Sequence, residues 1–381
     1  AVERARDFGN LCRNLDGTRP VTQALASWDP QWEIYDPLAG QHEVIGYNYM
    51  LHKAEGDHQR VPSRIIWQTE SYPRDAFRNW KKVNDLPYVI GDFVWTGIDY
   101  IGESGIGRCW YEGDPEGEHY HRPLWPWHNS YCGDIDIIGV RKPISYYREM
   151  LYSPDPRMHL AVREPQGYKG KIKEGLWAVY PTKDSWNWPG HEGKPVEVEV
   201  TSTYPEVELF LNGTSLGRCP TDRLHAFKAV YSVDYTPGEL VAVAYDSNGA
   251  KAYEEKLVTS GKPYSIRLRA DRTRISSEPQ SLAYVLAEVV DKKGNVVTDA
   301  AVPLKFTVEG NAEVLATGSG NPKDPKGYFH AERVTDEGKA LGVVKSNGRP
   351  GDIKVRVSAP GLKSATLTLK SIEEIIPFKL S

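Results

Sequence analysis

Two apolar runs in the sequence end in side chains that could act together on a sugar. Glu70 closes the run at residues 64–70, and Trp95 lies near the end of the next run, at residues 88–96. If these runs are neighbouring parallel strands, both side chains stand at the carboxyl edge of the sheet, where α/β barrels carry their catalytic groups. A carboxylate beside an indole suits glycoside chemistry, because the C–H face of a sugar ring packs on the indole while the carboxylate attacks. The pattern therefore predicts a carbohydrate site with Glu70 at its centre.

Each of these residues also has a simpler interpretation. Glu70 could be an ion-paired acid at a strand end, and Trp95 could be part of a hydrophobic core. His119 and His121 lie among acidic residues and invite a metal interpretation, but no third ligand is set by the spacing, and a solvated loop is favoured. No metal site is therefore predicted.

The bulk composition excludes several classes of partner. Among 381 residues, 40% are hydrophobic and 26% are charged, and the formal net charge of −4 predicts neither a nucleic-acid nor another polyanion partner. No apolar stretch approaches the length of a membrane span, so no membrane partner is predicted. The four cysteines form no C-x-x-C pair and are expected to be free thiols. Many of the 11 Trp and 22 Tyr residues lie between Trp67 and Trp127, which favours a ligand cleft there.

Residues 1–155 are predicted to form strand–helix units. Val2, Ala5, Phe8, Cys12 and Leu15 recur at helical spacing and predict an opening helix with a buried stripe.

Strands are expected at residues 19–25, 44–49, 64–70 and 88–96, and a last helix carries Ile144, Tyr147 and Leu151. Strands without clear alternation, separated by helices, indicate a parallel sheet buried on both faces. Four such units are half of an eight-unit (β/α)8 TIM barrel, so the region is predicted to be a half-barrel.

The remaining sequence changes to a period of two, which is typical of antiparallel sheets. Val196, Val198 and Val200 alternate with polar residues, and Asn212-Gly213 after another alternating run predicts a hairpin. Residues 156–260 are therefore expected to form one β-sandwich. Residues 261–381 are expected to form a second, so that two immunoglobulin-like sandwiches follow one another.

An ordered set of short motifs resembles glycoside hydrolase family 2, the β-galactosidase and β-glucuronidase group, and in particular the C-terminal portion of multidomain members from gut bacteria. The set covers nearly the whole sequence in the family's order. The motifs are Thr18-Arg19-Pro20-Val21-Thr22, Gly46-Tyr47-Asn48-Tyr49, Trp67-Gln68-Thr69-Glu70-Ser71, the run from Gly91 to Glu103, the run from Gly133 to Gly139, Trp186-Asn187-Trp188, Val207 to Gly213 with Ser215-Leu216-Gly217, and Gly318 to Pro322.

The resemblance implies a role for each candidate residue. Glu70 takes the place of the family's nucleophile, Tyr49 that of the tyrosine assisting it, and Trp95 that of the tryptophan lining the sugar subsite; Asn48 is a further candidate for contacting the sugar. The family's acid/base glutamate stands in an Asn-Glu pair on the preceding strand, and no Asn-Glu pair occurs in this sequence. The sequence therefore looks like the C-terminal part of such an enzyme, without its N-terminal sandwich and the first half of the barrel.

These features together predict a fragment of a retaining exo-β-glycosidase that acts by double displacement and needs no cofactor. Because the mechanism uses two carboxyl groups about 5–5.5 Å apart, the chain alone is expected to be inactive and its full-length parent active. A terminal β-galactoside is favoured, with glucuronide and mannoside open, and the family indicates a periplasmic or secreted protein. A homo-oligomer is expected to cover the open side of the half-barrel. The alternative is a non-catalytic carbohydrate-binding or scaffolding module.

Overall fold

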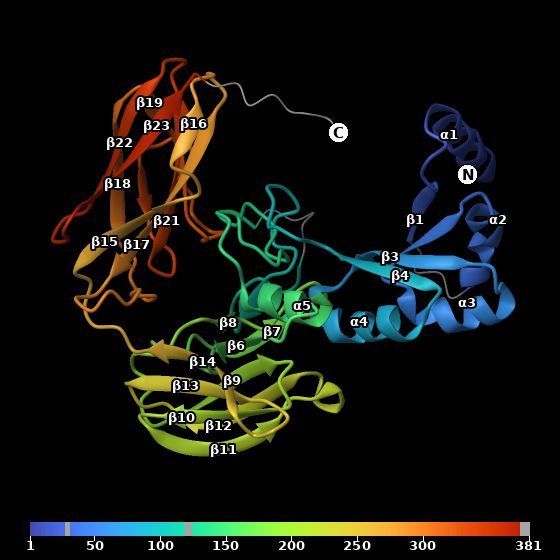
Figure 1. Ribbon diagram of the computed structural model, residues 1–381, viewed down its shortest axis with the longest axis horizontal. Coiled ribbons are helices and arrows are strands. Elements are labelled where there is room, and N and C mark those ends of the chain that lie inside the picture. The colour runs from blue at the N-terminus through green and yellow to red at the C-terminus, as the bar shows by residue number, and fades with distance from the viewer. Residues whose placement is uncertain (27–30, 119–123, 374–381) are drawn as a thin grey trace.

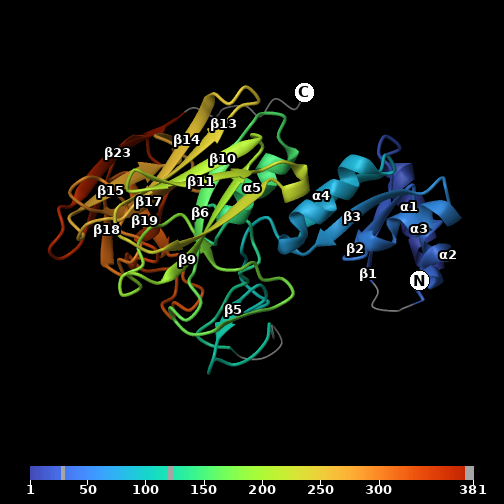
Figure 2. The ribbon, with the colours of Figure 1, turned by 90° about the horizontal axis from the view of Figure 1, so that it is seen from below.

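The computed structural model describes residues 1–26, 31–118 and 124–373, which form three units (Figure 1). A parallel sheet with helices comes first. A β-sandwich follows at the bottom of Figure 1, and a second sandwich at its upper left ends the described chain. Seen from below, the two sandwiches lie together on one side and the parallel sheet extends away from them (Figure 2). Strands thus predominate over helices along the chain.

The first unit is a four-stranded sheet in the order β1-β2-β3-β4, with every neighbouring pair parallel. Its strands are β1 (Thr22–Ala26), β2 (Val44–Asn48), β3 (Ile65–Ser71) and β4 (Val89–Val94). Its helical segments are α1 (Val2–Leu15), η1 (Trp32–Tyr35), α2 (Asp36–Ala39), η2 (Leu51–Lys53), α3 (Ala54–Arg60), η3 (Pro73–Asp75) and α4 (Ala76–Asp85). Four parallel strands connected in sequence agree with the predicted strand–helix units.

Only one face of this sheet is well covered. Ile45, Tyr47 and Ile66 belong to a buried core shared with the helices. On the other face, Trp67 meets Phe93 edge to face at 5.1 Å, yet Phe93 remains 52% exposed. The prediction that both faces are buried is therefore wrong for the described chain, because four strands are too few to close upon themselves and enclose their inner side chains.

The opening helix also differs from its prediction. Its bounds agree, and Ala5 lies in the core with Val2 packed against it. However, Phe8 is 66% exposed, Leu15 is 79% exposed and Cys12 is exposed too. The predicted stripe is thus buried only at its start, since the described residues leave the rest of that helix face uncovered.

A connecting region joins the sheet to the sandwiches. It contains β5 (Cys109–Tyr111), α5 (Pro143–Tyr152) and β7 (Ile172–Glu174), and β5 pairs with β7 in an antiparallel ribbon. Helix α5 packs its Tyr147 and Leu151 against α4, with Ile144 beside them, which confirms the predicted stripe. The hydroxyl of Tyr147 also donates to the carbonyl of Ala226 at 2.7 Å, so α5 fastens the first sandwich to the parallel unit.

The first sandwich packs the sheet β12-β9-β6-β8 against the sheet β11-β10-β13-β14. Its elements are β6 (Met158–Arg163), β8 (Thr182–Lys183), β9 (Pro195–Ser202), β10 (Glu206–Leu211), β11 (Thr214–Pro220), η4 (Arg223–His225), β12 (Lys228–Asp234), β13 (Glu239–Tyr245) and β14 (Lys251–Val258). The alternating valines of β9 face the core with Trp186 and Trp188. Asn212 and Gly213 both have positive φ and join β10 to β11, as a two-residue hairpin turn requires.

The second sandwich packs β15-β17-β21-β19 against β16-β23-β22-β18-β20. Its elements are β15 (Ser265–Ala270), β16 (Arg274–Ser276), β17 (Leu282–Val290), β18 (Pro303–Gly310), β19 (Ala312–Gly318), β20 (Glu332–Val334), β21 (Lys339–Ser346), β22 (Gly351–Ser358) and β23 (Ala365–Ile372). Leu304 and Phe306 of β18 are buried in its core, in agreement with the predicted alternation.

Three further features of the described residues bear on function. All four cysteines are free. No helix within them combines the length and apolarity needed to cross a lipid bilayer. No group of three or more His, Cys, Asp and Glu side chains is placed there to hold a metal, and the His119–His121 candidate lies outside the described residues.

His159 should make the stability of the first sandwich depend on pH. Its ring stacks on Tyr146, with Nε2 at 2.9 Å from Asp184 and Nδ1 at 3.2 Å from Glu255. Burial opposes the charged ring, but the two carboxylates outweigh it and raise the pKa of His159 to about 9. Because the folded protein binds this proton more tightly than the unfolded chain does, protonation of His159 stabilises the fold. The contribution is at most about 3 kcal/mol; it is complete below the unfolded pKa of about 6.5 and is lost as the pH rises to 9.

Urea unfolding followed by tryptophan fluorescence at pH 6, 7.5 and 9 should therefore show the wild-type midpoint falling across this window. In His159→Gln the fall should largely disappear, whereas exposed His330→Gln should behave as wild type. A wild-type midpoint that does not change between pH 6 and 9 would contradict the assignment.

Candidate active site

The predicted site residues meet at the carboxyl edge of the parallel sheet. Glu70 is the penultimate residue of β3 and pairs in register with Asn48 at the end of β2. On the other side, Ser71 pairs with Val94 of β4, and the Trp95 N–H donates to the Ser71 carbonyl at 2.9 Å. Backbone pairing of parallel strands thus brings the four candidates onto three adjacent strand ends.

Tyr49 is directly bonded to Glu70 through both its backbone and its side chain. Its N–H donates to the Glu70 carbonyl at 2.8 Å, and its hydroxyl donates to Glu70 Oε2 at 3.0 Å. Tyr49 has a φ of 60°, a left-handed conformation that turns the chain out of β2. The side-chain contact requires a protonated phenol, and burial raises the pKa of Tyr49 well above its usual value.

Trp95 and Asn48 make contacts of their own. The Trp95 indole donates to the Tyr100 hydroxyl at 3.1 Å, and Tyr100 in turn donates to Glu103. Asn48 is 7% exposed, and its Oδ1 accepts a hydrogen bond from Thr69 at 2.6 Å. Trp95 therefore keeps part of its ring accessible at the sheet edge, while Asn48 is mostly enclosed.

Trp177, which the sequence-based prediction missed, completes the group around Glu70. Its indole N–H donates to the Tyr49 hydroxyl oxygen at 2.9 Å, and its ring meets that of Tyr49 edge to face at 5.7 Å. Tyr72 packs on both rings, with its centroid 4.5 Å from that of Tyr49 and 5.3 Å from that of Trp177. Trp177 follows β7, more than 100 residues after Glu70, so no local signal links the two.

The segment that follows Trp95 is held in place from two sides. Asp99 is 2% exposed, accepts a hydrogen bond from the Gly133 N–H at 2.7 Å, and pairs with Lys142 at 2.8 Å. Its burial raises its pKa although Lys142 opposes this effect. These contacts connect the beginning of the region between Trp95 and α5 to its end, next to the candidate site.

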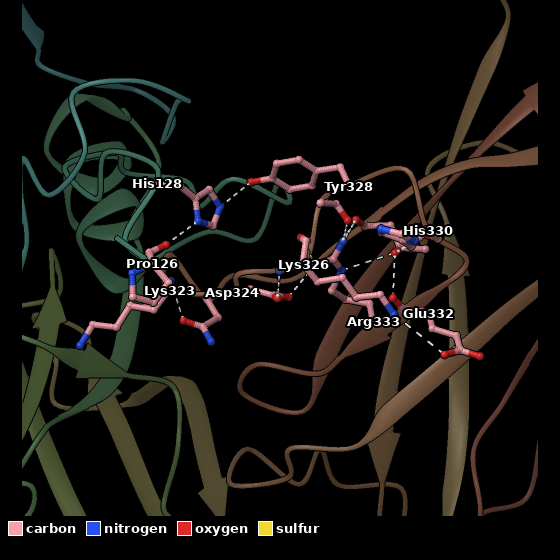
Figure 3. A network of polar contacts seen from close by, with 12 residues as sticks. Pro126, His128, Lys323, Asp324, Lys326, Tyr328, His330, Glu332 and Arg333 are labelled. Atoms are coloured by element: carbon pink, nitrogen blue, oxygen red, sulfur yellow. Dashed lines mark hydrogen bonds and ion pairs between the residues drawn. The ribbon is translucent and has the colours of Figure 1, made fainter. Parts of the chain in front are cut away.

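The second sandwich holds the same segment through the network in Figure 3. The His128 N–H donates to the Pro322 carbonyl at 3.0 Å, and His128 Nε2 lies 2.8 Å from the Tyr328 hydroxyl. Because His128 Nδ1 faces the Pro126 carbonyl at 3.1 Å, Nδ1 carries the hydrogen and Nε2 accepts the one from Tyr328. Residues 124–131 are therefore bound to the loop between β19 and β20.

The buried Arg333 side chain holds that loop together through hydrogen bonds and an ion pair. It is 2% exposed, pairs with Asp324 at 2.6 Å, and donates to the carbonyls of Thr317, Lys326 and Gly327. This arrangement explains why a loop rich in turn residues keeps a defined shape.

A cavity of about 270 Å³ opens elsewhere, where the parallel unit meets both sandwiches. Lys142, Lys183, Asp136 and Asp336 line it, and none of the four candidate residues does. Burial raises the pKa of both aspartates to about 6. Since none of the four candidates lines it, this cavity is not the site that they form.

Two known families each match part of one sandwich. Residues 266–368 match a family described as glycoside hydrolase family 2 C-terminal domain 5. Residues 193–253 match DUF4982, a domain of unknown function.

Individual proteins match along most of the chain. It is 32% identical to a protein named β-galactosidase BoGH2A from Bacteroides ovatus, over 96% of this chain and 43% of that protein. It is 26% identical to a putative β-glucuronidase from Formosa agariphila, over 66% of this chain and 21% of that protein. A solved glycosyl hydrolase family 2 member from Bacteroides cellulosilyticus superimposes with a TM-score of 0.88 at 36% identity, over 97% of this chain and 47% of that one. The chain thus spans less than half the length of these relatives.

Removing the Arg333 guanidinium should release the loop that binds residues 124–131. In Arg333→Met, Asp324 and three carbonyls lose their donor, and breaking such a buried pair costs about 3–5 kcal/mol. Amide hydrogen exchange should then quicken in the loop around Tyr328 and also in residues 124–131. Exposed Arg349→Met should leave both segments unchanged. If exchange quickened in the loop alone, the docking of residues 124–131 would not depend on Arg333.

Proposed function

The chain represents the C-terminal portion of a glycoside hydrolase family 2 protein, and from this premise we propose that it supplies the nucleophile of a retaining exo-β-glycosidase. The observation that carries the proposal is the hydrogen bond from the Tyr49 hydroxyl to Glu70, made at the carboxyl edge of a parallel sheet beside Trp95. The carboxylate stands at the end of a strand, as catalytic groups of α/β barrels do, and it accepts a hydrogen bond from a hydroxyl. With an accessible indole nearby, it provides the nucleophile and the sugar-binding surface that attack on a sugar ring requires.

In the proposed reaction, ionised Glu70 attacks the anomeric carbon. A glycosyl ester forms as the glycosidic C–O bond breaks, and the leaving oxygen takes a proton from the second carboxyl group. Water then attacks the same carbon, gives its proton to that second group, and releases the sugar and the Glu70 carboxylate. Tyr49 supports the ionised form of Glu70, because a hydrogen bond to the carboxylate favours its charge. Trp95 would pack on the apolar face of the sugar ring.

The second carboxyl group is not assigned to any residue of this chain. The family's acid/base glutamate stands in an Asn-Glu pair, which the sequence lacks. We therefore propose that residues 1–381 alone are nearly inactive and that turnover belongs to the longer protein. The sugar proposed is a terminal β-galactoside, because the 32% identical relative is named a β-galactosidase. A β-glucuronide is the second candidate, because the 26% identical relative is named a putative β-glucuronidase.

We further propose that residues 1–155 are the C-terminal half of a (β/α)8 barrel and that residues 156–260 and 261–381 are immunoglobulin-like sandwiches. Support for the half-barrel comes from the sequential, parallel order of β1 to β4. Within the described chain, β1 pairs only with β2 and β4 only with β3, so both outer strands keep an open edge. Such edges readily pair with further strands.

Mechanism-based labelling tests the nucleophile. In the full-length protein, a 2-fluoro-β-galactoside should form an ester at Glu70, located by peptide mass spectrometry. Glu70→Gln should lower kcat by about a thousandfold or more, the scale on which loss of a nucleophile acts. The exposed Glu112→Gln is the matched control and should retain full activity. Normal turnover by Glu70→Gln would show that Glu70 is not the nucleophile, and would favour a non-catalytic carbohydrate-binding or scaffolding role for this chain within the longer protein.

The open sheet should make the isolated chain self-associate. Phe93 on β4 and Ile65 on β3 are 52% and 42% exposed, and a second copy would cover them. Light scattering should give a mass above that of one chain, and Phe93→Lys should shift it toward the monomer. Leu224→Lys provides the control, since Leu224 is 93% exposed but lies on the first sandwich. A wild-type chain that stays monomeric would contradict this proposal.

A further inference from the structure

We propose that Trp177 is a positioning residue for the nucleophile: its indole fixes the Tyr49 hydroxyl in the orientation that donates to Glu70. This inference rests on the proposed function and deepens it. It assigns a role in the reaction to a segment that lies outside the parallel sheet and enters the first sandwich.

The donor and acceptor chemistry of the three groups permits one arrangement. An indole N–H can only donate, whereas a phenol hydroxyl donates once and accepts at its oxygen. Because the Trp177 indole lies 2.9 Å from the Tyr49 oxygen, that oxygen accepts there. The single O–H of Tyr49 is then left for Glu70 Oε2, 3.0 Å away. Trp177 therefore selects the direction in which the hydroxyl points.

Ring packing keeps the indole in place. The Trp177 ring meets Tyr49 at 87° and Tyr72 at 71°, with centroids 5.7 and 5.3 Å apart. Edge-to-face contacts of this kind stabilise aromatic pairs beyond the effect of the area they bury. The three rings form one unit, which fixes the position of the Tyr49 oxygen beside the carboxylate.

The backbone of Trp177 is anchored separately. Glu118 accepts its N–H at 3.2 Å and that of Gly107 at 2.9 Å. Just before it, Arg74 donates to the Gly175 carbonyl at 3.2 Å. A Cβ at Gly175 would come within 1.9 Å of the Glu118 side chain, so glycine permits the close approach.

The β5–β7 ribbon holds the chain three residues before Trp177, where Glu174 pairs with Cys109. The indole is therefore held by the connecting region and by η3, not only by its neighbours in the site. Trp177 contacts none of the reacting atoms, and its influence on the reaction runs through Tyr49.

Trp177→Phe in the full-length protein isolates this role, because phenylalanine keeps an aromatic ring but loses the N–H. We expect kcat/KM to fall by about tenfold to a hundredfold, the scale of losing precise orientation. The acid limb of the kcat/KM profile should move to higher pH, since a carboxylate with a weaker donor is harder to ionise. Trp80→Phe makes the same change on α4, where the indole packs against Phe77 and Phe227, and should alter neither.

A double-mutant cycle with Tyr49→Phe provides the decisive measurement. If Trp177 acts through Tyr49, adding Trp177→Phe to Tyr49→Phe should cause no further loss. Additive losses, or an unshifted acid limb in Trp177→Phe, would overturn the inference. Glu118→Gln offers a second variant that keeps the indole; it should show a smaller loss and a shift of the acid limb in the same direction.

The labelling rate separates this inference from the proposed function. A 2-fluoro-β-galactoside should modify Glu70 in both wild type and Trp177→Phe, but more slowly in the variant. Equal rates would refute the positioning role and leave the nucleophile assignment intact. Absence of label at Glu70 in the wild type would refute the proposed function itself.

Discussion

The hydrogen bond from Tyr49 to Glu70 crosses the ends of two neighbouring parallel strands, and the rest of the site is arranged around it. Parallel pairing of β2 with β3 sets the two residues side by side, and the left-handed conformation of Tyr49 turns its ring toward the carboxylate. A side-chain contact between strand ends needs a sheet whose register is secure. That register is secured by the core on the helix-covered face, where Tyr47 and Ile66 are fully buried.

Each sandwich supports a different part of this edge. The region entering the first sandwich brings Trp177 to Tyr49, and the second sandwich holds residues 124–131 through His128 and Tyr328. Both contacts join segments far apart in the sequence, and both rest on polar anchors, half-buried Glu118 for Trp177 and buried Arg333 for the loop around Tyr328. The second sandwich carries no candidate catalytic residue, yet it influences the site by holding residues 124–131 in place.

The face of the parallel sheet that the helices do not cover has no such packing partner among the described residues. Trp67 and Phe93 pack on each other, and the Trp67 indole bonds Thr22 at 3.1 Å, but the described chain supplies no further layer over them. The exposed end of α1, with Phe8 and Leu15, has the same character. Side chains of this size normally lose such exposure when a neighbouring element packs on them. Both surfaces are therefore apolar areas that the described chain leaves uncovered.

Patterns in the sequence were sufficient to predict the strands of the parallel sheet, helices α1 and α5, and the hairpin, but not the short helical segments from η1 to α3 or the β5–β7 ribbon. The four apolar runs, the alternating valines of β9 and the Asn212-Gly213 turn follow from local periodicity and turn chemistry, and the structure has them at nearly the predicted positions. The placement of Glu70 and Trp95 near one another also followed, because the carboxyl ends of neighbouring parallel strands share one edge. Errors arose where burial depends on a partner, as for the outer side of α1 and the uncovered sheet face.

By itself, then, the sequence determined the four parallel strands and the period-two pattern of the remaining chain, which side chains could act as nucleophile and sugar platform, and that an Asn-Glu pair is absent. Only the tertiary structure decided that Trp177 bonds Tyr49, that His128 meets Tyr328, and that Arg333 is buried among carbonyls. The physical reason is separation along the chain. Periodicity and turn signals act over a few residues, whereas Trp177 and Tyr49 are 128 residues apart and His128 and Tyr328 are 200 apart. The Arg333 contacts lie within the second sandwich and depend on how its loop packs around the guanidinium.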